Sequence, residues 1–231
     1  MEKHLQEEKH FKDSELIRDI VIGMSDGLTV PFALAAGLTG AIDSTAIILT
    51  AGAAEIAAGS IAMGLGGYLA GKTDVEHYET EWEREHKEII EVPDKEEEEV
   101  AEVFRGYGLE EEQIQSITAA IKKDTNHWVD FMMKFELGLE KPEPGRASKS
   151  ALTIAISYIV GGIIPLAPYI IIPEPASALL LSVLLTLIAL VVFGYIKGRF
   201  TGTAPWKSAI QTAIVGGLAA TVAFGLARLL S

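Results

Sequence analysis

Five long apolar stretches constrain this chain more than any other feature of its sequence. They cover approximately residues 20–42, 45–70, 150–172, 176–197 and 207–230. Each stretch has the ~20 residues that a helix needs to cross the hydrocarbon core of a bilayer. Backbone polar groups in lipid must be paired within the protein, and a helix pairs them within one segment. We therefore expect an all-α membrane protein with five transmembrane helices.

The charged residues mark out a second part of the chain. Residues 72–149 hold 22 of the 32 acidic and 11 of the 19 basic residues, and so −11 of the net charge of −13. The predicted divisions are an N-terminal segment with helices one and two (1–71), an acidic domain (72–149) and helices three to five (150–231). Such an acidic domain repels nucleic acid, which excludes a nucleic-acid partner. The chain has no cysteine, which excludes thiolate metal sites.

The short connections between spans predict the orientation in the membrane. Lys197, Arg199 and Lys207 flank the connection between spans four and five, whereas the hairpins on the other side carry Asp43 and Glu174. The positive-inside rule then places the N-terminus and the acidic domain in the cytosol, and the C-terminus on the far side. The N-terminal segment is charged and has no apolar core of its own, so no cleavable signal peptide is expected.

The acidic domain is expected to be helical. No glycine or proline occurs between Lys72 and Pro93, so the second span should continue into the cytosol as one long helix. Apolar residues then recur at helical spacing in three segments, which are 100–107, 114–121 and 128–139. The predicted fold is thus five transmembrane helices with a cytosolic three-helix domain inserted between spans two and three.

Carboxylates and thioethers in this domain fall at ligand spacing. The candidate metal ligands are Glu85, Glu88, Glu96, Glu99, Met132, Met133 and Glu136. The first four form two i,i+3 pairs, each on one face of a helix. The alternatives are that the glutamates form a solvated face and that Met132 belongs to the apolar core. The spacing leaves four further candidates open, which are Glu102, His77, His86 and His127.

Three side chains inside the first two spans suggest a path for an ion. Asp26 lies in the first span, and Glu55 and Met63 lie on one face of the second. An ionisable side chain at membrane depth costs about 2.5–3.5 kcal/mol on insertion scales and usually has a functional role. A thioether beside carboxylates favours Fe²⁺ or a similar transition metal over Mg²⁺ or Ca²⁺. Packing alone is the alternative for Met63. The carboxylates could exchange a metal for protons.

The same residues resemble a known family. Residues 18–34, which read Arg-Asp-Ile-Val-Ile-Gly-Met-Ser-Asp-Gly-Leu-Thr-Val-Pro-Phe-Ala-Leu, resemble the first helix of the vacuolar iron transporter family. Residues 55–63, together with Gly67 and Tyr68, resemble its second helix. The domain that ends with residues 131–136 resembles its cytosolic metal-binding domain. The resemblance covers nearly the whole chain and is greatest to plant members, because shorter relatives lack the acidic insert.

The resemblance implies a homodimer that exports Fe²⁺ from the cytosol into the vacuole in exchange for protons, and Mn²⁺ is a further candidate substrate. It implies a path at the subunit interface through Asp26, Glu55 and Met63, and a cytosolic site made of the seven candidate ligands. Fe²⁺ would be the substrate rather than a prosthetic group, and Zn²⁺, Co²⁺ or Mn²⁺ could occupy the cytosolic site. The membrane would be that of the vacuole.

Two functions of a different class are alternatives to transport. A membrane enzyme could use Asp26 and Glu55 as an acid pair, but the sequence shows no nucleophile–base arrangement, so no enzyme is expected. A membrane-tethered metal sensor or buffer would use the acidic domain alone, and it remains the alternative to transport.

Overall fold

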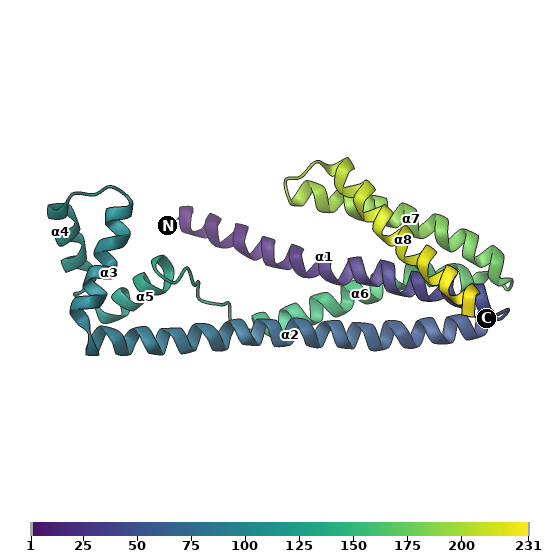
Figure 1. The fold of residues 1–231 in the computed structure, drawn as a ribbon, viewed down its shortest axis with the longest axis horizontal. Coiled ribbons are helices and arrows are strands. Elements are labelled where there is room, and N and C mark those ends of the chain that lie inside the picture. The colour runs from purple at the N-terminus through teal and green to yellow at the C-terminus, as the bar shows by residue number, and fades with distance from the viewer. Residues whose placement is uncertain (1, 231) are drawn as a thin grey trace. The chain divides into compact units, whose positions relative to one another are not determined.

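The computed structural model describes residues 2–230, with side chains from residue 15 onward. These residues form eight α-helices and no strand (Figure 1). The helices are α1 (Glu2–Ala41), α2 (Thr45–Glu91), α3 (Pro93–Gly106), α4 (Glu111–Ile121), α5 (Thr125–Phe135), α6 (Arg146–Ile171), α7 (Pro175–Phe200) and α8 (Pro205–Leu230). The expectation of an all-helical protein is confirmed. Most side chains of the charged N-terminal segment, which was predicted to be cytosolic, lie outside the described residues.

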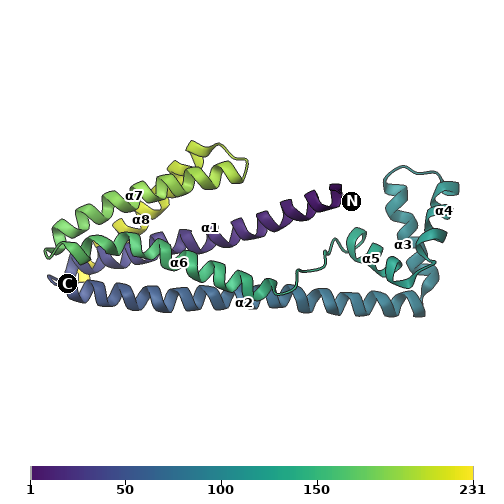
Figure 2. The same cartoon turned by 180° about the vertical axis from the view of Figure 1, so that it is seen from behind.

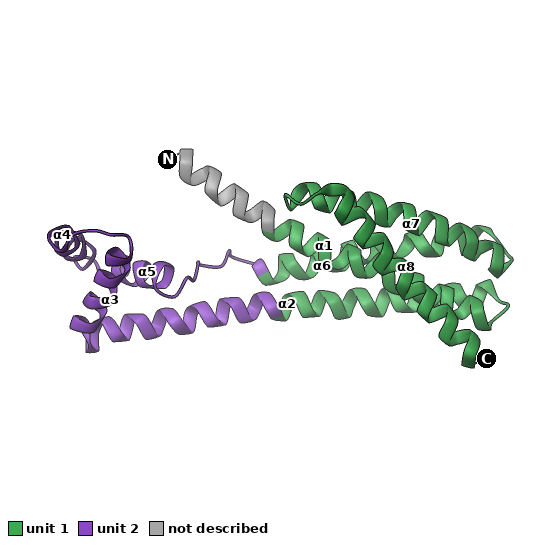
Figure 3. Cartoon of the chain, turned by 45° about the horizontal axis from the view of Figure 1, so that its top comes forward, with its two compact units in different colours: residues 1–69, 147–231 green, residues 70–146 purple. Residues whose placement is uncertain are grey.

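Five of the described helices are long and apolar enough to cross a membrane. They are residues Glu15–Ala41 of α1, together with α2, α6, α7 and α8, and they correspond to the five stretches predicted from the sequence. The chain divides into two compact units, residues 1–69 with 147–231 and residues 70–146 (Figure 3). We call them the five-helix unit and the acidic unit.

Glycines let α6 approach α1 in the five-helix unit (Figure 2). A Cβ atom added at Gly23 would lie 2.3 Å from the carbonyl oxygen of Ile154, and one added at Gly27 would lie 2.2 Å from that of Tyr158. The two backbones are therefore in direct contact, as small residues permit between membrane helices. Pro31 lies a turn further along α1, and the helix continues through it.

The helices α7 and α8 pack against each other and against α1. Gly194 is one point of close approach between α7 and α8, because a Cβ atom there would lie 2.8 Å from Cα of Ala209. A buried hydroxyl joins α7 to α6, since Ser182 donates a hydrogen bond of 2.7 Å to the carbonyl oxygen of Pro165. The last turn of α7 carries Lys197 and Arg199.

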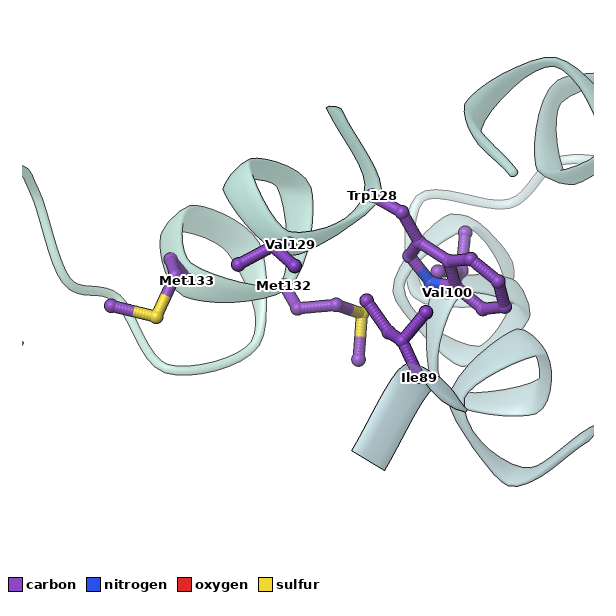
Figure 4. Close-up of a cluster of buried hydrophobic side chains, with 6 residues drawn as sticks. All are labelled: Ile89, Val100, Trp128, Val129, Met132 and Met133. Carbon is purple, nitrogen blue, oxygen red and sulfur yellow. The ribbon is translucent and has the colours of Figure 1, made fainter. Parts of the chain in front are cut away.

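Local sequence signals fix the helices of the acidic unit. Helix α2 runs to Glu91, as predicted, and Pro93 begins α3 at the position where a missing N–H costs least. Asp124 caps α5 by accepting hydrogen bonds from the backbone N–H groups of Asn126 (2.9 Å) and His127 (3.2 Å). The core of this unit consists of Ile89, Val100, Trp128, Val129, Met132 and Met133 (Figure 4).

The α1–α6 contact predicts a position-specific effect of alanine. Gly27→Ala should destabilise the protein, because its methyl group collides with the Tyr158 backbone and overpacking typically costs about 1–3 kcal/mol. Thermal unfolding in detergent measures the effect. The control is Gly225→Ala in α8, where nothing described lies within 4 Å of the added Cβ atom. Equal melting temperatures for the two variants would contradict the close contact.

Candidate metal centres

The hydrophobic core of the acidic unit places two carboxylates inside it. Ile89 of α2 and Val100 of α3 pack with Trp128 and Met132 of α5. Glu85 precedes Ile89 by one helical turn and Glu96 precedes Val100 by one turn, so each carboxylate lies on the same helix face as a core residue. Their exposed fractions are only 1% and 0%. Packing of apolar side chains therefore forces both acids out of water.

The acids form two groups of three that share one member. Oxygens of Glu85, Glu88 and Glu96 all lie within 4.8 Å of one another, and so do oxygens of Glu96, Glu99 and Glu136. We call these groups the first and second triads. All five glutamates were candidates from their spacing, and α2, α3 and the C-terminal end of α5 bring them together. Oxygen atoms at such separations suit a divalent cation.

The triads carry more negative charge than their surroundings compensate. Among the described side chains, none donates a hydrogen bond to Oε2 of Glu85 or to either oxygen of Glu96. Burial, with the nearby charges of Glu99 and Glu85, raises the pKa of Glu96 to about 7. The same causes raise the pKa of Glu136 to about 7. Near neutral pH, a bound cation would therefore replace protons at this site.

The remaining candidates of this unit lie differently. Met132 and Met133 are buried in the hydrophobic core, and Figure 4 shows Met132 reaching toward Ile89 while Met133 points the other way. The core position matches the alternative weighed for Met132, and the role of either thioether as a ligand stays a prediction. Glu102 is exposed, and among the described residues neither it nor any histidine belongs to a triad.

The five-helix unit contains the three candidates for a membrane path. Asp26 lies in α1, and Glu55 and Met63 lie in α2; all three are partly buried. Glu55 accepts a short hydrogen bond at Oε1 from the hydroxyl of Tyr158 in α6. No described side chain donates to its Oε2. This oxygen is thus a candidate ligand for a cation.

Tyr158 is the site residue that the sequence analysis missed. Its side chain is 2% exposed and passes over Gly59, where an added Cβ atom would lie 2.4 Å from the phenolic oxygen. Gly59 therefore makes room for the hydrogen bond between Tyr158 and Glu55. The position of Tyr158 within an apolar span could have indicated its role, because a tyrosine there needs a hydrogen-bond partner for its hydroxyl. The sequence did not show which partner it has.

The fold and these sites define the class of protein as an α-helical membrane protein with a separate acidic helical unit suited to cations. The chain belongs to the VIT family, whose profile matches residues 17–228. This match confirms the family resemblance that the sequence motifs indicated.

Curated relatives match over almost the whole chain. Vacuolar iron transporter 1 of Tulipa gesneriana is 57% identical over 222 residues, which cover 96% of this chain and 90% of the tulip protein. Vacuolar iron transporter 1 of Arabidopsis thaliana is 56% identical over 221 residues, covering 96% and 88%. Protein CCC1 of Saccharomyces cerevisiae is 33% identical over 226 residues, covering 94% and 70%.

The raised pKa values predict that metal binding depends on pH. Glu96 and Glu136 hold protons below about pH 7 and must release them to bind a metal. The affinity of the full-length protein for Co²⁺ should therefore fall as pH decreases below 7, by about ten- to a hundredfold per pH unit, and level off above about pH 8. Isothermal titration calorimetry over this range measures it.

Two variants test whether the triads cause this pH dependence of Co²⁺ binding. Glu96→Gln should weaken Co²⁺ binding strongly, because it removes the member common to both triads. Glu112→Gln is the matched control, since it removes an exposed carboxylate of α4 outside the triads. Affinity that is independent of pH, or equal losses in the two variants, would argue against the triads as the site.

Proposed function

We propose that the chain transports Fe²⁺ from the cytosol across the vacuolar membrane, in exchange for protons. The observation that carries the proposal is Glu55, a carboxylate inside an apolar helix with one oxygen for which no described side chain is a donor. A carboxylate at membrane depth is costly and is retained mainly where it serves an ion or proton. The names of the plant relatives supply iron as the substrate and the vacuole as the location.

Proton coupling follows from the chemistry of the carboxylates. In an apolar environment the charge of a bare carboxylate is costly, and either a proton or a metal ion offsets it. Binding Fe²⁺ from the cytosol would release protons, and protons from an acidic lumen would displace the ion in turn. The thioether of Met63 would add a soft ligand, which favours Fe²⁺ and tolerates Mn²⁺, Co²⁺ or Zn²⁺.

The acidic unit would capture the metal before transport. Its five clustered carboxylates offer two triads that share Glu96, enough ligands for a divalent ion in each. We place this unit and the N-terminus in the cytosol and the C-terminus in the lumen, because Lys197 and Arg199 end α7 on the side that the positive-inside rule assigns to the cytosol. We further propose a homodimer with the path between its subunits and no enzymatic activity.

Uptake into liposomes tests transport and its coupling. Wild-type protein in liposomes with an acidic lumen should accumulate Fe²⁺, and collapse of the pH gradient should stop it. Asp26→Asn should reduce the rate by more than about tenfold, because the amide can neither release a proton nor neutralise the ion. Asp43→Asn, which changes a carboxylate in the connection between α1 and α2, should transport at the wild-type rate.

The same assay separates transport from the sensor or buffer reading. Fe²⁺ binding by wild-type protein without any uptake would support a buffer and reject the transport proposal. Uptake that persists in Asp26→Asn at the wild-type rate would reject the membrane path while leaving transport itself intact.

The hydrogen bond to Glu55 yields a prediction for Tyr158. Tyr158→Phe keeps the ring and removes the donor, so Glu55 loses its orientation. The uptake rate should fall by about ten- to 150-fold, as expected for a hydrogen bond to a charged group worth about 1.5–3 kcal/mol. Folding should be retained, which thermal unfolding checks. Tyr195→Phe in α7, whose ring packs against Trp206, is the matched control. An unchanged rate in Tyr158→Phe would contradict the orienting role.

A further inference from the structure

A cationic side chain already occupies the edge of the first triad. Nη2 of Arg84 donates to Oε1 of Glu85 at 3.0 Å, and Nε lies 3.9 Å from Oε1 of Glu88. The same Nη2 lies 2.8 Å from Oε2 of Glu81, which belongs to neither triad. Arg84 is half-exposed, with 48% of its side chain accessible. It therefore has a second partner beside the site and free space in which to move.

The second triad has an equivalent cation. Nζ of Lys95 lies 2.8 Å from Oε1 of Glu99 and 3.7 Å from Oε1 of Glu96, and 63% of its side chain is exposed. The positive charges of Lys95 and Arg84 also act on Glu136, where they lower a pKa that burial raises. Each triad thus has one partly exposed positive charge, carried by a residue next in sequence to one of its members.

We propose that Arg84 and Lys95 are built-in competitors of the metal: they occupy the carboxylates of the empty triads and are displaced by a divalent ion. The inference rests on the proposed capture of metal by the two triads. Buried oxygens with no described donor, on Glu85 and Glu96, show that the resident cations satisfy the carboxylates only in part. A divalent ion that fills these positions repels both side chains, because like charges this close interact strongly.

Displacement is inexpensive in this geometry. Arg84 keeps its contact with Glu81 when it leaves Glu85, and the exposed ammonium of Lys95 moves into water. The competitors therefore weaken metal binding without blocking it, and they speed release by re-entering the triads as the ion departs. A capture site that must pass its ion onward needs such moderate affinity.

Calorimetry of Co²⁺ binding to the full-length protein in detergent micelles tests the proposal. Arg84→Gln and Lys95→Gln should each bind Co²⁺ about tenfold more tightly, as expected from removing one positive charge near a divalent ion. Arg84→Lys, which keeps the charge, should bind as the wild type does. Lys87→Gln is the matched control, because it removes a charge from α2 whose partner is Glu91, outside both triads, and it should change the affinity by less than about twofold.

Two kinetic readouts separate competition from a structural role. Dissociation of Co²⁺ into excess chelator should be slower in Arg84→Gln than in the wild type. In Fe²⁺ uptake, this variant should lower both KM and the maximal rate, because tighter capture slows release. A variant that was merely misfolded would bind more weakly.

The outcomes distinguish this inference from the proposed function. If the wild type binds Co²⁺ and both glutamine variants bind it equally well or more weakly, the competitor role alone is overturned. Binding that is absent from the wild type and from all variants overturns the capture site, and the inference falls with it. Tighter binding in both glutamine variants, with Lys87→Gln unchanged, supports the competitor role.

Discussion

Both candidate sites depend on one constraint, which is a buried carboxylate oxygen to which no described residue donates a hydrogen bond. A buried carboxylate without donors is unfavourable unless it binds a proton or a cation. Glu96 in the acidic unit and Glu55 in the five-helix unit both have oxygens for which no described side chain is a donor. An ion bound at either position would offset the cost of these unpaired oxygens.

Hydrophobic packing imposes this cost in the acidic unit. The core formed around Val100 and Met132 holds α2, α3 and α5 together, and the helical period then fixes Glu85 and Glu96 one turn from core residues. Because protein interiors are densely packed and deform little, the acids cannot separate to reduce their repulsion. Protonation, Arg84 and Lys95 can each offset this repulsion, and in the proposed mechanism a divalent ion would displace all three.

The sequence determined much of the fold because its signals were local. The five apolar stretches, the run without glycine or proline before Pro93 and the i,i+3 glutamate pairs each report on one helix, and the structure reproduces those helices. Contacts between helices could not be predicted from such local signals. The sharing of Glu96 by two triads depends on how α2, α3 and α5 pack. The partner of Tyr158 depends on a close approach that Gly59 permits.

The carboxylates of the triads and of the membrane helices have different hydrogen-bond donors, and the surroundings of each site explain the difference. At the triads, water is near and the half-exposed Arg84 can bring a full positive charge to Glu85 and remove it again. At membrane depth, a guanidinium would be costly to bury and would repel an entering cation. Tyr158 instead offers Glu55 a neutral hydroxyl, which fixes one oxygen through a hydrogen bond and leaves the negative charge of the carboxylate for the ion. A charged competitor suits a site that must capture an ion and pass it onward, whereas a neutral donor suits a site that must attract an ion into lipid.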